Sequence, residues 1–548
     1  MLRFSLFLAV IVTVANSAKA VVVDDTAYLL FARHLAVQPL KPYDFELFFY
    51  AEPQPAMEIL MPPVLPYWLA AGIALFGEKT FLLKLWLFPF AGILAVSLAV
   101  LLRRFTGEDR KLSLAVLMLS SAVLPLFNFM LDVPAIALGL AAVTLFVNAT
   151  EAPTKGKWWT CVIGSGLFTG LAIETKYSQL VIPAVIAFYG LIHRKFATAA
   201  IALAIALLLI VGWERFVMVQ CGQSHFLLHF QSATGNADAG PIDKLRAKFE
   251  YALPLTTQLG GVAFGFALWG LRAAGAPKWL DYACAAVSVI AISLVLIYPD
   301  SQLVFTDRTL FRYQLDVPFT ASLLSGVGAL TVSLAILLRF SRTPGTTHRD
   351  SLFLAAWFAL EILGVLGMSP FPAARRFIGL ALVIGLIVAR GIVRFEPPGR
   401  WIAGVAISWG FTLFALDCWD AEAERVTVIQ ARDIIRPTAT QTIWYTGHWG
   451  FQYYADRAAF RQLNPKQWRP AVGDWFVFPE LPDEYEYYRP CPPLRVLPDW
   501  LKVELVGEVV CDDRLRAQTV PNLYCGAAVL HGREYPRLKL AVYRITGP

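Results

Sequence analysis

Two adjacent carboxylates, Asp24 and Asp25, follow directly after an apolar run over residues 4–23. Acidic pairs are costly beside a lipid bilayer, so such a pair usually marks a functional site. A carboxylate at a membrane face could act as a general base toward a hydroxyl group. The pair could instead only cap a helix that begins near Thr26, because the start of a helix favours negative charge.

Positive side chains recur at the same predicted face of the membrane. Lys176 lies in a predicted turn, and Arg375 and Arg376 precede a late apolar run. Lysine and arginine hold phosphate groups through charge-assisted hydrogen bonds. A base near such cations therefore predicts a lipid phosphate as substrate. A structural interpretation stays open, in which the lysine reaches to lipid headgroups and the arginines anchor the interface.

Asp132 stands where one apolar run turns into the next, so it could cap the following helix or order the neighbouring cations. Tyr28 and Arg33 follow the acidic pair and could belong to the same site. They could equally lie on an interfacial helix without touching a substrate.

Composition sets the class of protein that must position these groups. Hydrophobic residues make up 57% of the 548 residues and charged residues only 16%, whereas a soluble domain is near half apolar and a quarter charged. The net charge is +7, but the basic residues are scattered, which argues against nucleic-acid binding. The seven cysteines and seven histidines form no CxxC or HExxH pattern, so no metal site is indicated.

The apolar residues are grouped in long runs, which is the pattern of transmembrane segments. We therefore expect an all-α polytopic membrane bundle. A shorter run, Val64–Phe76, contains Pro66 and is expected to be interfacial or re-entrant. The thirteen expected spans lie at residues 4–23, 81–102, 112–130, 133–149, 159–175, 178–192, 197–213, 252–271, 281–298, 319–338, 352–368, 376–392 and 400–417.

The charges of the loops predict the orientation of the chain. With the N-terminus inside, sixteen basic residues fall in six short cytoplasmic connections and five in the short outer ones. The loops over residues 24–80 and 214–251 then face outward. The first run also resembles a signal peptide ending at Ala18-Lys19-Ala20, and cleavage there would leave the orientation unchanged.

Residues 1–417 are expected to form the membrane domain, and residues 418–548 a small extracytoplasmic α/β domain. The second region has no run long enough to span, and GDWFVFPE and LKLAVYRI are typical of short strands. A disulfide among Cys491, Cys511 and Cys525 is possible there, but the sequence does not choose the pair.

Four segments resemble the GT-C superfamily of glycosyltransferases, in the group of lipid A aminoarabinose transferases and protein O-mannosyltransferases. RRFIGLALVIGL is a weaker similarity, and beyond residue 200 the likeness is mostly one of architecture. The four segments are DDTAYLLFARHL (24–35), MPPVLPYWLAAGIALFGEKTFLLKLWLFPF (61–90), MLDVPAIALGLAA (130–142) and GLAIETKYSQLVIPAV (170–185).

The resemblance implies transfer of a sugar from a polyprenyl phosphate to an acceptor hydroxyl or phosphate, with inversion, at the extracytoplasmic face of the cell inner membrane. Asp24 would be the general base, Asp25 would orient it, and Lys176 would bind the donor phosphate. Asp132 would order the cations, with Tyr28, Arg375 and Arg376 in support. Weaker candidates for binding the phosphate are Arg33 and Lys84.

The resemblance leaves the acceptor open among lipids, glycans and proteins; the expected partners are this acceptor, the lipid-linked donor and membrane lipids. No cofactor is certain, and a divalent cation is possible without being indicated. Two residues depart from the family pattern. Met61 stands where a polar or basic residue precedes the prolines, and Asp25 stands where Glu is common.

Two alternatives to an active transferase stay open. A lipid-linked-sugar flippase or other transporter would place charges near the bilayer midplane on broken helices. A degenerate enzyme would bind the lipid without turnover, and the departure at Met61 makes that plausible. The gathering of charged residues at one membrane face favours the enzyme.

Overall fold

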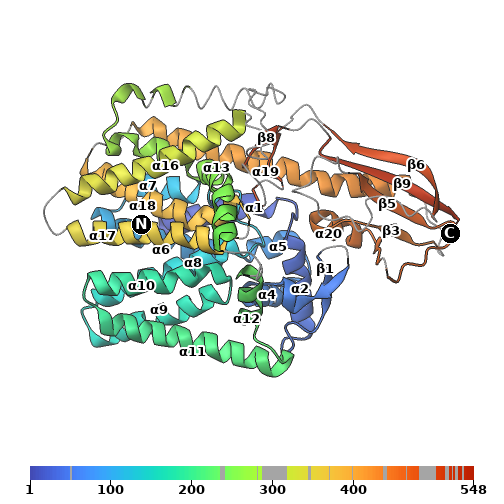
Figure 1. Ribbon diagram of the computed structural model, residues 1–548, viewed down its shortest axis with the longest axis horizontal. Helices are drawn as coiled ribbons and strands as arrows, with labels where there is room; N and C mark the ends of the chain where they lie inside the picture. The colour runs from blue at the N-terminus through green and yellow to red at the C-terminus, as the bar shows by residue number, and fades with distance from the viewer. Residues whose placement is uncertain are drawn as a thin grey trace.

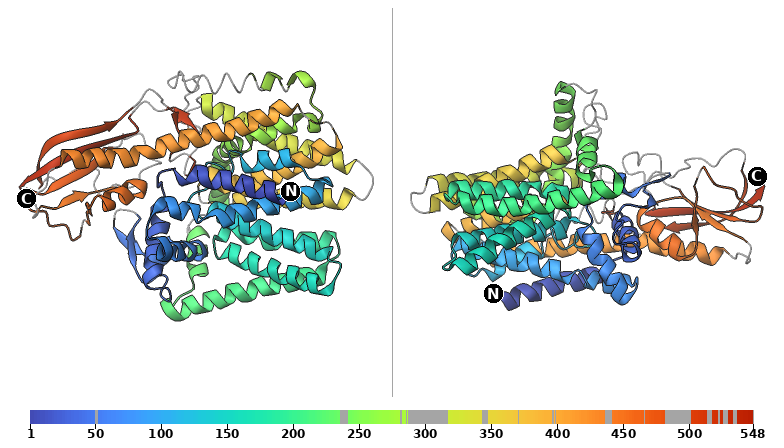
Figure 2. Two further views of the ribbon diagram at one scale, coloured as in Figure 1. Left: turned by 180° about the vertical axis from the view of Figure 1, so that it is seen from behind. Right: turned by 90° about the horizontal axis from the view of Figure 1, so that it is seen from below.

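A computed structural model shows a bundle of helices with a β-sheet at one end (Figure 1). The N-terminus lies in the bundle and the C-terminus at the tip of the sheet, as both further views also show (Figure 2). The structure describes residues 1–49, 52–234, 241–280, 282–284, 286, 317–342, 347–369, 371–395, 397, 399–435, 441–464, 466–480, 501–512, 517–520, 523–524, 529–532 and 536–547.

Within the described residues, eight helical stretches are long and apolar enough to cross a membrane. The protein is therefore a largely helical, multi-pass membrane protein. The helices of the bundle are α1 (Leu2–Ser17), α5 (Thr80–Leu85), α6 (Phe88–Thr106), α7 (Lys111–Met118), α8 (Asp132–Thr150), α9 (Lys155–Ile173), α10 (Val181–Ile192), α11 (Phe196–Cys221), α13 (Pro241–Ala274), α16 (Val317–Ser341), α17 (Thr347–Met368), α18 (Ile378–Arg394) and α19 (Arg400–Ile434).

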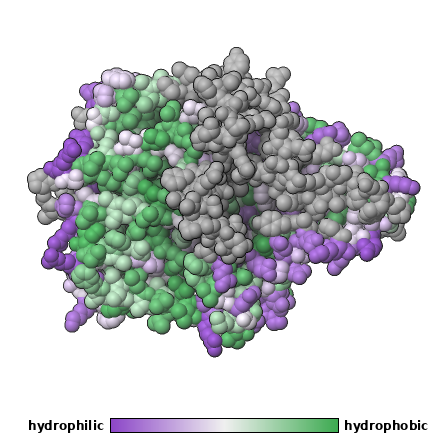
Figure 3. All heavy atoms as spheres, viewed as in Figure 1, coloured by the Kyte–Doolittle hydropathy of each residue, from purple (hydrophilic) through white to green (hydrophobic). Residues whose placement is uncertain are grey.

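The surface of the bundle is apolar, as expected for contact with lipid. Hydrophobic side chains form a broad band over the helices, with hydrophilic residues at the edge of the bundle and around the sheet (Figure 3). On α11, Leu208 is 73% exposed, whereas Leu138 and Ala142 on α8 are buried. Helix α8 therefore lies inside the bundle, and α11 presents its leucines outward.

The expected span over 112–130 is wrong as a single helix. Helix α7 ends at Met118, and turns lead through buried residues to the start of α8. Ser120, Ser121, Pro125 and Asn128 disfavour a helix here, because proline lacks an N–H and short polar side chains compete for backbone groups. The span over 281–298 falls almost wholly outside the described residues, and the count of thirteen is not confirmed.

The loop of residues 24–80, here called the first loop, is folded against the bundle. The short run Val64–Phe76 forms the thirteen-residue helix α4, as the sequence predicts. The two strands of the loop pair antiparallel. The other elements of this loop are α2 (Asp25–Val37), β1 (Glu46–Phe48), β2 (Pro53–Pro55) and α3 (Ala56–Ile59).

The C-terminal region contains a five-stranded sheet in the order β4-β3-β5-β9-β6. Strand β3 pairs parallel with β4 and β5, and β9 pairs antiparallel with β5 and β6. Helix α20 (Trp449–Arg457) and the end of α19 cover one face through Phe451, Val428 and Ala431. The strands are β3 (Ile443–Tyr445), β4 (Arg461–Gln462), β5 (Trp475–Glu480), β6 (Lys502–Cys511) and β9 (Leu538–Gly547), and a separate pair is formed by β7 (Ala517–Gln518) and β8 (His531–Gly532).

Strands β5 and β9 coincide with the two segments expected as strands. Helix α19 continues through residue 417, so the domain boundary at 417 stays a prediction. The predicted disulfide also stays a prediction, because Cys491 and Cys525 lie outside the described residues.

Candidate active site

The acidic pair sits at a strained turn before α2. Val23 has a φ of 49°, which is unusual for a β-branched residue. Such strain costs about 1–3 kcal/mol and is concentrated at functional sites. Asp24 is the N-cap of α2, yet its side chain makes no capping hydrogen bond. The Asp24 carboxylate therefore does not cap α2.

Asp24 is instead paired with Arg375, which lies 351 residues further along the chain. Arg375 Nη1 donates to Asp24 Oδ2 over 2.7 Å, and both side chains are almost buried. The arginine belongs to the short 3-10 helix η2 (Ala374–Phe377), which precedes α18. Its neighbour Arg376 lies with its guanidinium 4.2 Å from the centre of the Phe371 ring.

Lys176 and Asp132 form a second ion pair close to the first. Lys176 precedes the 3-10 helix η1 (Tyr177–Leu180), and Asp132 is the first residue of α8. The side chain of Asp132 thus reaches the lysine instead of capping its own helix. Burial lowers the pKa of Lys176 to about 8, although Asp132 opposes this shift.

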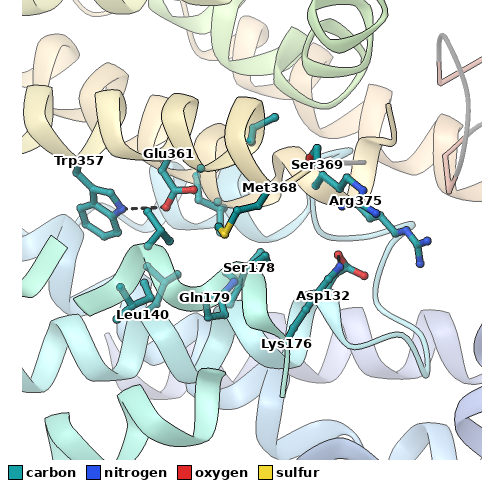
Figure 4. Close-up of a pocket in the computed structure, with 18 residues that line it drawn as sticks. Asp132, Leu140, Lys176, Ser178, Gln179, Trp357, Glu361, Met368, Ser369 and Arg375 are labelled. Carbon is teal, nitrogen blue, oxygen red and sulfur yellow. Dashed lines mark hydrogen bonds and ion pairs between the residues drawn. The ribbon is translucent and has the colours of Figure 1, made fainter. Parts of the chain in front are cut away.

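Both pairs meet at one cavity of about 60 Å³, which is room for a few water molecules or one compact group. Figure 4 shows Asp132, Lys176 and Arg375 at one end and Leu140 and Trp357 at the other. Asp24 reaches this end through its bond to Arg375. The cavity is lined by Asp132, Ile136, Leu140, Lys176, Ser178, Gln179, Val181, Ile182, Trp357, Glu361, Gly364, Val365, Met368, Ser369, Arg375, Arg376, Gly379 and Leu382.

Asp25 points to a different environment. Its side chain is fully buried, and burial raises its pKa to about 6, while Lys84 and Lys19 act in the opposite direction. Lys84 itself donates to the backbone carbonyls of Lys19 and Ala20, over 2.6 Å and 3.3 Å. Lys84 is therefore a neighbour of the acidic pair and is not part of the cavity lining.

Arg33 lies apart from the cluster. Its guanidinium makes a two-point ion pair with Glu78, over 2.7 Å and 2.9 Å, and is 44% exposed. The structure does not bring it to the cavity lining. Tyr28 is buried, and burial together with the charge of Asp24 raises its pKa. Its position beside Asp24 and Arg375 agrees with a supporting role.

Two further carboxyl groups lie in this region: Glu174, which the sequence places beside Lys176 at the same predicted turn, and Glu361, which was not expected from the sequence. Glu361 lines the cavity and accepts a 3.0 Å hydrogen bond from Trp357 Nε1. As the only acidic residue inside the apolar run over 352–368, it could have been recognised. Glu174 is 2% exposed, neither carboxyl oxygen has a hydrogen-bond partner among the described residues, and burial raises its pKa to about 8.

No group of three or more His, Cys, Asp or Glu side chains that could hold a metal ion is found in the described part of the chain. The groups that gather here are carboxylates, a lysine and arginines. This set can hold an anionic group and accept a proton next to it.

The family described as dolichyl-phosphate-mannose-protein mannosyltransferase matches residues 61–213. The match includes Asp132 and Lys176, and it confirms the resemblance to GT-C glycosyltransferases that the sequence predicts. The match indicates a glycosyltransferase. No curated protein sequence matches the chain.

Several solved structures are similar to the chain, among them the following three. AglB, an archaeal oligosaccharyltransferase from Archaeoglobus fulgidus, in complex with an inhibitory peptide and a dolichol-phosphate, has a TM-score of 0.46 and 12% identity, covering 86% of this chain and 69% of its own. ArnT from Cupriavidus metallidurans bound to undecaprenyl phosphate has a TM-score of 0.42 and 15% identity, covering 99% and 98%. The apo state of ArnT has a TM-score of 0.44 and 14% identity, with the same coverage.

Proposed function

We propose that the protein is an inverting glycosyltransferase that moves a sugar from a polyprenyl phosphate to an acceptor hydroxyl at the extracytoplasmic face of the cell inner membrane. The observation that carries the proposal is the joining of Asp24 to the cationic cavity end through Arg375. Asp24 lies near the start of the chain and Arg375 lies 351 residues further on, yet the two side chains meet at this end of the cavity.

The reaction divides between these residues. Asp24 takes the proton of the acceptor hydroxyl, whose oxygen forms a bond to the anomeric carbon of the sugar. The bond from that carbon to the phosphate oxygen breaks, and the electron pair leaves with the polyprenyl phosphate. Lys176 and Arg375 stabilise the negative charge that grows on the leaving phosphate. Attack from the side opposite the phosphate inverts the anomeric centre.

The two ion pairs must open for this to happen. Arg375 is now held by Asp24, and Lys176 by Asp132. A phosphate bound at the cavity would compete for both cations, which would release the Asp24 carboxylate toward the acceptor. The apolar end of the cavity, with Leu140 and Trp357, would lie toward the first part of the prenyl chain.

The test measures transfer of radiolabelled sugar from undecaprenyl phosphate into membrane extracts, with mannosyl, glucosyl and 4-amino-arabinosyl donors. Wild type is compared with Asp24→Asn and with Asp44→Asn, a matched change at an exposed carboxylate of the first loop. We expect transfer in wild type and Asp44→Asn and its loss in Asp24→Asn. Equal transfer by all three variants, or translocation of the donor without transfer, contradicts the proposal.

A further inference from the structure

A second, larger cavity lies between the first loop and the C-terminal sheet. Its volume is about 540 Å³, within the range of small-molecule sites. One side comes from β1 and its neighbours, and the other from α20 and the strands β3 and β4. The cleft, as we call it, is lined by Leu30, Phe45, Glu46, Leu47, Phe48, Trp444, Gln452, Asp456, Phe460, Arg461 and Gln462.

The lining combines aromatic faces with separate polar groups. Phe45, Phe48 and Trp444 supply flat apolar surface, and Glu46 and Arg461 supply exposed charges at the rim. A sugar ring presents an apolar C–H face and a border of hydroxyl groups. Aromatic side chains cover such a face, while carboxylate and guanidinium groups bond the hydroxyls.

Gln452 is the residue that marks the cleft as a binding site. Its residue surface is only 5% exposed, yet no hydrogen bond in the described part of the chain uses its side-chain amide. The amide nitrogen and oxygen keep some solvent exposure at the cleft, where water or a ligand can bond them. The amide can donate two hydrogen bonds and accept others, which suits a hydroxylated ligand.

The cleft leads toward the acidic pair. Phe48 and Gln452 also line a small adjoining cavity of about 10 Å³, together with Val23 and Thr26. These last two residues flank Asp24 and Asp25 in the chain. Thr26 Oγ1 donates to the backbone carbonyl of Trp449 over 2.6 Å, which fixes α20 beside the start of α2.

We propose that the cleft binds the acceptor and that the acceptor is a saccharide. The inference rests on the transferase function proposed above. The ring lies against the aromatic residues, and a hydroxyl beyond Gln452 reaches Asp24, which takes its proton as the oxygen bonds to the donor's anomeric carbon. The phosphate leaves with the electrons of the broken bond, as in the general reaction.

A peptide acceptor fits the cleft less well. Peptides commonly bind by adding a strand to an exposed sheet edge, where main-chain hydrogen bonds provide the affinity. Here β4 has two residues and β1 has three, and β1 is already paired with β2. The cleft offers side chains in place of a long strand edge, which favours a ring with hydroxyl groups.

The test is direct binding to the full-length protein in nanodiscs without donor, so it does not depend on turnover. Saturation-transfer NMR is recorded with maltose, cellobiose and chitobiose, and with a serine-containing hexapeptide. We expect a disaccharide to bind and its affinity to fall about five- to tenfold in Gln452→Leu, the effect of losing one or two hydrogen bonds. The matched control Gln467→Leu changes an exposed glutamine outside the cleft and should bind like wild type.

A second variant, Glu46→Gln, keeps the test decisive if Gln452→Leu does not fold, because Glu46 is exposed. It should weaken the same disaccharide severalfold. Equal affinity in wild type and both cleft variants overturns the inference, as does binding of the hexapeptide without any disaccharide. Transfer is measured separately with Asp24→Asn. If no disaccharide binds in the cleft, the transferase proposal still stands. If no sugar is transferred, the measured binding in the cleft still stands.

Discussion

Arginine side chains lie near both ends of helix α18, and they make different kinds of contact at the two ends. At one end, Arg375 holds Asp24 and lines the cavity with Lys176. At the other end, Arg390 donates to the backbone carbonyl of Phe105 over 2.9 Å and lies 3.8 Å from Asp350. The same residue types therefore build a cavity end in one place and a helix-to-helix contact in the other.

At the end of α18 that carries Arg390, further ion pairs join the neighbouring helices. Arg104 on α6 bonds both carboxylate oxygens of Asp350 on α17, over 3.0 Å and 3.1 Å, and also pairs with Glu151 over 2.8 Å. These contacts tie α6, α17 and the end of α8 together. Buried or half-buried charges alone thus do not identify a reaction site; their position at a cavity does.

The largest effect is expected at the proposed base. Asp24→Asn should reduce the rate of sugar transfer by about 10²- to 10⁴-fold, the usual contribution of a general base. Donor binding should persist, because Arg375 and Lys176 are unchanged. Single-turnover transfer and donor binding, measured on the same preparation, check this prediction. A loss of binding equal to the loss of rate would assign Asp24 to the binding of donor.

A smaller loss is expected from the cation. Lys176→Gln should lower kcat/KM for the donor by about ten- to a hundredfold, through a higher KM and a lower kcat, because a hydrogen bond to a charged group is lost in both the bound state and the transition state. Steady-state kinetics with a defined undecaprenyl phosphate sugar check it. If kcat falls and KM does not, the lysine does not bind the ground-state phosphate.

The pH dependence of donor binding should follow Lys176. With a pKa of about 8, this lysine is charged below pH 8 and loses its charge above it. The loss of this charge weakens the binding of a phosphodiester, by about tenfold between pH 7 and pH 9. Lys176→Arg, which stays charged, should show a much flatter profile; an identical decline in both proteins would contradict this cause.

The smallest effect on transfer is expected at the other end of α18. Arg104→Gln should leave the transfer rate within about twofold of wild type, while lowering the apparent Tm by a few degrees through the lost pairs with Asp350 and Glu151. Thermal unfolding in detergent and the transfer assay check this together. If Arg104→Gln impaired transfer as strongly as Lys176→Gln, the distinction between the two ends would fail.

Most of the membrane helices could be predicted, because spanning depends on the sum of local hydropathy. The failure at 112–130 has a tertiary cause that hydropathy does not register. Asn16 Nδ2 bonds the carbonyl of Leu124 over 2.8 Å, and Lys19 Nζ bonds that of Pro125 over 3.0 Å. Side chains from α1 and the residues after it thus satisfy backbone groups that a helix would otherwise have satisfied itself.

The sequence predicted which residues are candidates for the site, but not which of them contact one another. Asp24, Asp132 and Lys176 lie within segments that resemble the family, and the family match covers the last two. Nothing in their spacing assigns Arg375 to Asp24 or Lys84 to the surroundings of Asp25. These assignments depend on how distant helices pack.

By itself, the sequence determined where the chain is apolar enough to enter a membrane and at which ends of those runs the charges stand, because both are local properties. Only the tertiary structure decided which charges meet, since Arg375 and Asp24 are brought together across 351 residues by packing. It also decided that Gln452 faces a cleft beside the acidic pair, because this requires the docking of α20 on the first loop.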